Sequence, residues 1–155
     1  MIVDERIITF INSLDTKNSE ILEDIEREAL ADNVPIIRRE MQSFLKVLLM
    51  VKKPMRVLEV GTAVGFSALL MSEYVPEECA ITTIENYEKR IPIARQNFVR
   101  AGKEKKITLL EGDAMDVLKT LEGPYDFIFM DAAKGQYIDY LPDIPRSVAT
   151  GGIFV

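Results

Sequence analysis

The stretch "VLEVGTAVGFSALL", residues 57–70, decides the fold of this chain of 155 residues. Its first four residues set three apolar side chains around one carboxylate, a pattern typical of a short buried strand. Gly61 and Gly65 then flank a turn, and residues 64–74 are predicted to form a helix. Glycine lets a backbone turn sharply and approach a ligand closely. The stretch therefore predicts a strand, a tight turn and a helix in succession.

The same alternation continues to the end of the chain. Further strands are predicted at "AITTIE", "KITLLEG", "YDFIFMD" and, as the start of a fifth, "GGIFV"; helices are predicted over residues 87–101, 114–121 and 136–147. Apolar strands that alternate with helices predict a parallel sheet covered on both faces, with right-handed connections. The predicted fold class is therefore α/β, a doubly wound parallel sheet.

Three helices are predicted before the sheet, over residues 4–14, 18–32 and 38–51, where apolar residues recur at helical spacing. We expect residues 1–54 to form a helical segment packed on a sheet domain of residues 55–155. The chain ends at Val155 inside a predicted strand, where a free carboxylate would be poorly solvated. We therefore expect the sheet domain to be truncated within its fifth strand.

Composition excludes several classes of site. The chain has no histidine, which excludes a Ser-His-Asp triad and His-ligated zinc. Its single cysteine, Cys79, excludes a disulfide framework. The net charge of −6 gives no overall attraction for nucleic acid. No apolar run predicts a membrane span or a signal peptide, so we expect a cytoplasmic protein that does not contact membranes.

Residues suited to ligand binding stand at the ends of three predicted strands or just after them. Gly61 and Gly65 follow the first, Glu85 ends the second, and Asp113 follows the third. Each alone is also typical of an ordinary turn or of a helix start. Together they point to one crevice at the carboxyl ends of parallel strands, where open α/β sheets bind ligands. A carboxylate at Glu85 suits a ribose diol, so the pattern predicts a nucleoside site.

The fourth strand ends in the sequence "YDFIFMDAAKGQY", which places Asp131 and Lys134 at the mouth of a buried strand. Taken alone, these two residues are as typical of a solvated strand end and an ordinary loop cation.

Four motifs, "GTAVGFSA", "IEN", "GDA" and "DAAKGQY", together resemble the class I S-adenosylmethionine-dependent methyltransferases, which have a Rossmann-like sheet. Within that class they are similar to the metal-dependent caffeoyl-CoA and catechol O-methyltransferases. "NVPII", "GTAVGFSA" and "DAAKGQY" most resemble the bacterial tRNA 5-hydroxyuridine methyltransferases. The resemblance covers nearly the whole chain.

The resemblance implies catalytic roles for Asp131 and Lys134. Asp131 would bind a divalent cation such as Mg²⁺, for which carboxylate oxygen is a suitable ligand, and would lie near the methyl donor. Lys134 would help to deprotonate the substrate hydroxyl. The family completes its metal site with an Asp-Asn pair that would fall after Val155, so this chain is expected to hold one ligand of the set.

The resemblance also implies the residues that bind S-adenosylmethionine. Glu59 and Gly61 match the glycine-loop motif, Ser67 matches the serine that meets the methionine carboxylate, and Glu85 would bind the ribose. Asp113 and Ala114 would contact the adenine edge, while Ile37 would contact the cofactor through its backbone. Asp131 would also lie against the cofactor.

Three functions remain open from the sequence. The first is methylation of 5-hydroxyuridine at the tRNA wobble position, in the anticodon loop. The second is methylation of a small catechol-like or phenolic molecule, and the third is a non-catalytic cofactor-binding or dimerisation module. RNA binding would use two groups of cations, which are Arg38, Arg39, Lys46, Lys52, Lys53 and Arg56, and Lys103, Lys105 and Lys106. The amino-terminal helices carry more apolar residues than one sheet edge needs, including Ile7, Ile8, Phe10 and Ile11. Members of the family that the motifs resemble are commonly homodimers, so the resemblance implies a homodimer here too.

Overall fold

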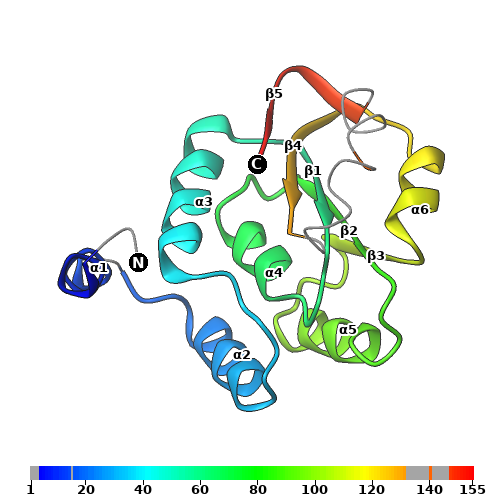
Figure 1. The fold of residues 1–155 in the computed structure, drawn as a ribbon. Coiled ribbons are helices and arrows are strands. Elements are labelled where there is room, and N and C mark those ends of the chain that lie inside the picture. Colours follow the sequence, from blue (N-terminus) through cyan, green and yellow to red (C-terminus); the bar gives the residue numbers. More distant parts are fainter. Residues whose placement is uncertain (1–3, 15, 132–139, 141–146) are drawn as a thin grey trace.

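Five parallel strands form one sheet through the middle of the molecule (Figure 1). This computed structural model describes residues 4–14, 16–131, 140 and 147–155. The strands are β1 (Arg56–Val60), β2 (Ala80–Glu85), β3 (Ile107–Glu111), β4 (Tyr125–Met130) and β5 (Val148–Phe154), and they lie in the order β3-β2-β1-β4-β5. The predicted doubly wound parallel sheet is therefore confirmed.

Helices cover both faces of this sheet. The described helices are α1 (Glu5–Ser13), α2 (Glu20–Ala31), α3 (Arg39–Lys52), α4 (Phe66–Glu73), α5 (Ile91–Arg100) and α6 (Ala114–Thr120). Alternate residues of each strand point to opposite faces. In β1, Val57 joins a core with α2, α3, α4 and α5, whereas Leu58 joins a second core with α6. Figure 1 shows α3 and α4 on one side of the sheet and α6 on the other.

Two elements begin well away from the residue that the sequence pattern predicted, whereas the other starts differ from it only slightly. Helix α5 starts at Ile91, four residues later than expected, because Asn86 and Tyr87 donate their backbone N–H groups to the Glu85 carboxylate instead of entering a helix. Strand β5 starts at Val148 rather than at Gly151, and its pairing with β4 is irregular between Tyr125 and Phe127. The helix predicted over residues 136–147 lies almost wholly outside the described residues.

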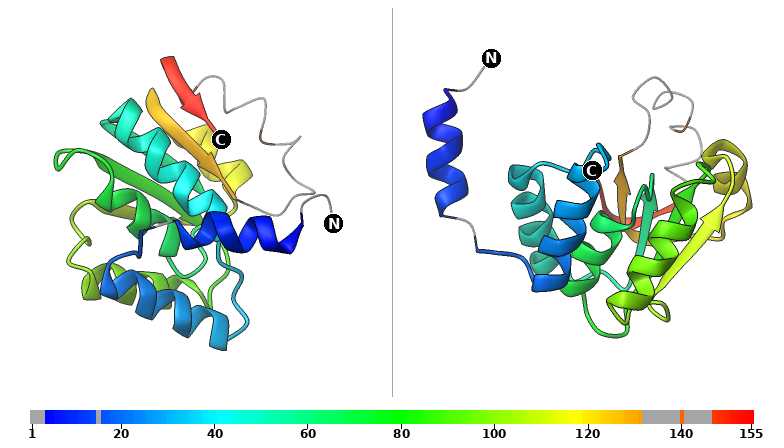
Figure 2. Two further views of the ribbon diagram at one scale, coloured as in Figure 1. Left: turned by 90° about the vertical axis from the view of Figure 1, so that its left-hand side faces the viewer. Right: turned by 90° about the horizontal axis from the view of Figure 1, so that it is seen from below.

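Helix α1 is the exception to this packing. It has no buried residue, and Figure 2 shows it standing apart from the helices that cover the sheet. Asn12 donates a hydrogen bond of 3.1 Å to Glu40 near the start of α3, which ties the end of α1 to the rest of the molecule. Among the described residues, no helix is long and apolar enough to cross a membrane.

Candidate functional site

A cleft of about 740 Å³ opens at the carboxyl ends of β1, β2 and β4. The chain leaves β1 toward β2 on one side, while β4 lies on the other side, so the strand order reverses at β1. This reversal is where open α/β sheets bind ligands. Six of the predicted site residues line the cleft, namely Ile37, Gly61, Ser67, Glu85, Ala114 and Asp131. Two other predicted site residues that the structure describes, Glu59 and Asp113, do not line the cleft.

The glycine loop between β1 and α4 lines the cleft with Gly61, Thr62 and Ala63. Gly61 has φ of 103°, and its N–H donates to the Ile84 carbonyl at 3.1 Å. Gly65 has φ of 85°, and a Cβ added there would lie 2.5 Å from the Phe98 ring. Asn97 donates its side-chain N–H to the Val64 carbonyl at 2.9 Å. Helix α5 therefore determines the shape of the loop through two adjacent side chains.

Glu59 lies beneath the loop and is completely buried. Its Oε1 accepts a short hydrogen bond from the Ser67 hydroxyl, and its Oε2 accepts one of 2.5 Å from Thr83. The Thr83 hydroxyl is in turn 2.6 Å from that of Thr62. Glu59 thus acts through Ser67 rather than facing the cleft itself.

The pKa of Glu59 is raised to about 7. Burial is the main cause, because it removes the charged form from water. The hydroxyls of Ser67 and Thr83 act in the opposite direction, and the charges of Asp131 and Glu85 raise the pKa further. Within the described residues, no Lys or Arg forms an ion pair with Glu59. The group therefore titrates near neutral pH.

Glu85 ends β2 and holds two loops together. Its Oε2 accepts from the Ala63 N–H at 2.7 Å, while its Oε1 accepts from Asn86 at 3.0 Å and Tyr87 at 2.9 Å. A carboxylate has about four acceptor positions, so roughly one remains for a ligand, on Oε2. The sequence predicted that Glu85 accepts from both ribose hydroxyls. In the structure it has acceptor positions left for about one of them.

Asp113 caps a helix. Its side chain accepts from the Met115 N–H at 2.8 Å at the start of α6, and it is exposed to solvent. Its neighbours Gly112 and Ala114 line the cleft. The end of β3 therefore reaches the site mainly through backbone and through Ala114.

Ile37 lies on the lip of the cleft and is held by a residue that sequence reasoning missed. The fully buried Gln42 donates its side-chain N–H to the Ile37 carbonyl at 2.9 Å, and also donates to Glu26 and accepts from Asn18. Thr83 was missed as well. Its only signal is the strand register, which pairs it with Glu59. Arg90 and Tyr140 also line the cleft without having been predicted.

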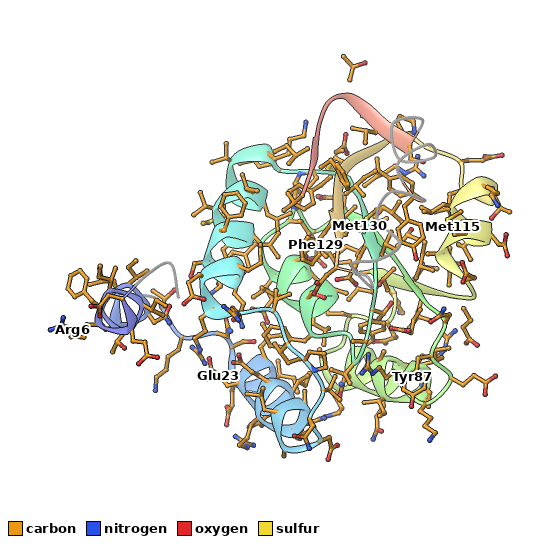
Figure 3. The ribbon with its side chains drawn as sticks, in the orientation of Figure 1. Arg6, Glu23, Tyr87, Met115, Phe129 and Met130 are labelled. Atoms are coloured by element: carbon orange, nitrogen blue, oxygen red, sulfur yellow. The ribbon has the colours of Figure 1, made fainter. Side chains whose placement is uncertain are left out.

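Asp131 follows β4 directly and is exposed on the cleft wall. Its backbone N–H donates to the Val60 carbonyl at 3.0 Å, which extends the pairing of β4 with β1. The two residues before it, Phe129 and Met130, are buried in the interior and are labelled in Figure 3. The predicted partner of Asp131, Lys134, lies outside the described residues.

The predicted metal site is not complete in this part of the chain. A Mg²⁺ ion takes about six oxygen ligands, usually with one or two carboxylates. The described residues contain no group of three carboxylate, histidine or cysteine side chains that could hold a metal. Asp131 alone does not make such a site, so a divalent cation would need further ligands besides this carboxylate.

Most of the cations considered for RNA binding contact the protein itself. Arg39 pairs with Glu23 and Glu26, Lys46 is buried, Lys52 donates to the Gly151 carbonyl, Arg56 donates to the Glu122 carbonyl and Lys106 donates to the Pro76 carbonyl. A cation that already donates to the protein contributes less to phosphate binding. The described surface therefore gives little support for a broad RNA-binding patch.

Known proteins are similar to this chain in both sequence and fold. A catechol O-methyltransferase of Niastella koreensis is 34% identical over 116 residues, which cover 72% of this chain and 52% of that protein. Caffeoyl-CoA O-methyltransferase 2 of Populus trichocarpa is 35% identical over 120 residues, covering 71% of this chain and 47% of that protein. The chain thus spans about half the length of the curated relatives it matches.

A crystal structure of a methyltransferase from Podospora anserina, bound to SAH, has a TM-score of 0.90. It is 29% identical, and the match covers 97% of this chain and 67% of that one. A sequence profile described as O-methyltransferase matches residues 12–155. With its parallel sheet, glycine loop and cleft, the chain belongs to the O-methyltransferase family.

Proposed function

We propose that the whole protein transfers a methyl group from S-adenosylmethionine to an acidic hydroxyl of a catechol-like molecule. The observation that carries this proposal is one cleft lined by the glycine loop, Glu85 and Asp131. The family to which the chain belongs and the SAH bound in a related structure support it. The cofactor, when bound, supplies an electrophilic methyl group on sulfur.

The cleft residues fit such a cofactor. Gly61, which has no side chain, lets a ligand approach the loop closely. The remaining acceptor position on Glu85 suits a ribose hydroxyl, and Ala114 offers an apolar surface to the adenine. Ser67 lies where the amino-acid end would be held. The residues thus bind and orient the cofactor, and such positioning supplies much of the rate increase in a two-substrate transfer.

Asp131 lies on the same wall and would face the reacting hydroxyl. We propose that Asp131 orients this hydroxyl and that Lys134 accepts its proton before the oxygen attacks. Asp131→Ala should abolish turnover. Lys134→Ala should lower kcat by about two to four orders of magnitude, the usual range for a general base, with little change in cofactor affinity.

The cofactor part of the proposal is tested at Glu85. Glu85→Ala should weaken binding of S-adenosylmethionine about 10-fold to 100-fold, the range for a hydrogen bond to a charged group. Calorimetry would measure the affinity. Glu111→Ala is a matched control, because Glu111 ends the neighbouring strand but pairs with Arg95 on the surface. Equal affinity in the Glu85 variant and the wild type would mean that the cleft binds another ligand.

Two substrate classes compete. The catechol and caffeoyl-CoA enzymes among the relatives favour a small phenolic hydroxyl. The motifs "NVPII" and "DAAKGQY" favour 5-hydroxyuridine in the anticodon loop of tRNA, whose hydroxyl is of comparable acidity. Because most of the candidate RNA-binding cations already contact the protein itself, the first class is our main candidate.

One experiment separates these classes. Transfer of labelled methyl groups from the cofactor would be compared for catechol and for tRNA that carries 5-hydroxyuridine, with and without EDTA. Preference for catechol supports the main proposal, and preference for tRNA supports the second candidate. Loss of transfer in EDTA would support the predicted divalent cation. Transfer to neither acceptor by the whole protein would contradict the proposed activity.

A further inference from the structure

The Ser67 hydroxyl lines the cleft, and the buried Glu59 carboxylate determines which hydrogen bonds it can make there. A serine hydroxyl has one proton, and Ser67 donates it to Glu59. A hydroxyl that has donated its proton offers only lone pairs to another partner. While Glu59 is ionised, Ser67 therefore presents an acceptor to the cleft, and an anionic group of a ligand finds no donor there.

The remaining hydroxyls follow the same rule. An ionised carboxylate can only accept, so Thr83 must donate to Glu59 over 2.5 Å. The proton of Thr83 is then committed, and Thr62 must be the donor in the contact of 2.6 Å between the two threonines. The charge on one buried carboxylate thus determines the direction of all the hydrogen bonds between these hydroxyls.

Protonation of Glu59 reverses the direction of its hydrogen bond with Ser67. A proton on Oε1 is donated to the Ser67 oxygen, and the proton of Ser67 becomes free to point into the cleft. One proton moves from solvent to the carboxylate, and no other bond is made or broken. The carboxylates that face Glu59, Asp131 after β4 and Glu85 at the end of β2, favour this form, and a further negative group in the cleft would favour it more.

We propose that Glu59 is a positioning residue that sets whether Ser67 donates or accepts in the cleft, and that a ligand carboxylate binds at Ser67 together with one proton taken up by Glu59. The inference rests on the proposed function, because the carboxylate is that of the amino-acid end of the cofactor. The same arrangement would bind an ammonium group at Ser67 without proton uptake.

The pH dependence follows from the titration of Glu59. Burial above all raises its pKa to about 7, so the carboxyl is ionised at pH 8 and largely protonated at pH 6 before any ligand arrives. Proton uptake is therefore expected at pH 8 and should be small at pH 6. One proton taken up per ligand makes the affinity fall by up to about tenfold for each pH unit above 7.

Calorimetry with S-adenosylhomocysteine tests the proposal. Titrations at pH 8 in two buffers of different ionisation enthalpy give the number of protons taken up. The comparison ligand is 5′-methylthioadenosine, which keeps the adenosine and the sulfur but has no carboxylate. S-adenosylhomocysteine should take up close to one proton more than 5′-methylthioadenosine.

Glu59→Gln is the matched variant. Its amide keeps both contact positions and donates one hydrogen bond, as the protonated carboxyl would, but it cannot titrate. The excess proton should vanish, and the affinity for S-adenosylhomocysteine should become nearly independent of pH between 6 and 8. A merely structural role of Glu59 would lower the affinity without changing the number of protons.

The outcomes separate the two proposals. If S-adenosylhomocysteine binds and the variant takes up as many protons as the wild type, this inference is wrong and the proposed function stands. If S-adenosylhomocysteine does not bind, both are wrong. Should thermal unfolding show that the variant does not fold, the two ligands on the wild-type protein decide alone, since equal proton numbers for both would overturn the inference.

Discussion

Single residues in this molecule often support the cleft without lining it. Glu59 is fully buried under the glycine loop, and Gln42 holds the carbonyl of Ile37 from within α3. Gly65 is necessary for a different reason, since its backbone has φ of 85° and the Phe98 ring fills the space where a side chain would start. Substitutions at these positions are expected to change stability as well as binding.

Glu59 makes the stability of the fold depend on pH. Its pKa is about 7 in the folded chain, against an ordinary value of 4.5, so the folded state binds its proton more tightly. This contribution is fully present below pH 4.5 and is lost as the pH rises through 7. Urea unfolding at a series of pH values measures this. As the pH rises, the free energy of unfolding of the wild type should fall relative to that of Glu59→Gln, by on the order of 3 kcal/mol in total. Parallel pH curves for the two proteins would contradict this.

Gly65→Ala should destabilise the fold by about 1–3 kcal/mol, the usual cost of overfilling a packed site. The added methyl group would lie 2.5 Å from the Phe98 ring, and the residue would also have to keep a positive φ. Gly102→Ala is the control, because Gly102 has a similar φ of 63° but no atom within 4 Å of the added Cβ. The two free energies of unfolding come from urea titrations, and equal losses would show that backbone conformation alone is responsible.

At the scale of elements, hydrogen bonds also join the starts of β1 and β4, at the edge of the sheet opposite the cleft. Asp126 in β4 accepts from the backbone N–H groups of Met55 and Arg56, both at 2.9 Å. The Arg56 guanidinium lies 4.7 Å from the centre of the Tyr125 ring and donates to the Glu122 carbonyl. These contacts fix how β1 enters the sheet beside β4.

Asp126→Ala should therefore lower the free energy of unfolding by about 1.5–3 kcal/mol, because two backbone donors lose a charged acceptor. Urea unfolding would measure the loss. Asp116→Ala, on the exposed face of α6, should have almost no effect. A loss shared by both variants would point to net charge rather than to these two hydrogen bonds.

The sequence predicted helices and strands correctly where they depend on residues close together in the chain. The strands and most helices follow from runs of apolar residues, and Glu85 follows from its place at a strand end. Asp131 was assigned to the site through the resemblance of its motif to a known family, and it does line the cleft. The start of α5 was wrong because Glu85 binds the next two backbone N–H groups. Thr83 and Gln42 were missed because their contacts to Glu59 and Ile37 depend on strand register and helix packing, which the chain alone does not display.

At the scale of the whole molecule, α1 and α3 leave a large apolar surface exposed. Ile7, Phe10 and Ile11 on α1, and Leu14 directly after it, are each at least half exposed. Phe44, Val47, Met50 and Val51 are similarly exposed on α3. A helix of nine residues with no buried side chain is not stable alone. Exposed apolar surface of this extent is typical of an interface.

We predict that this surface joins two copies of the protein. Light scattering should give the mass of a dimer, and Phe10→Asp should shift it toward the monomer because a carboxylate would be buried at the interface. Val99→Asp is the control, since Val99 is equally exposed on α5, outside the proposed interface. A monomer at all concentrations of the whole protein would contradict the prediction.

The contacts of α5 with the glycine loop limit how this fold can be recombined. Asn97 and Phe98 belong to the second strand–helix unit, yet they hold Val64 and Gly65 of the first. A chimera that exchanges only residues 56–74 with a relative would separate the loop from the side chains that support it. An exchanged segment that keeps these contacts with the glycine loop therefore runs at least from Arg56 through Phe98, and crossover points between α4 and β2 should yield chimeras that fold poorly.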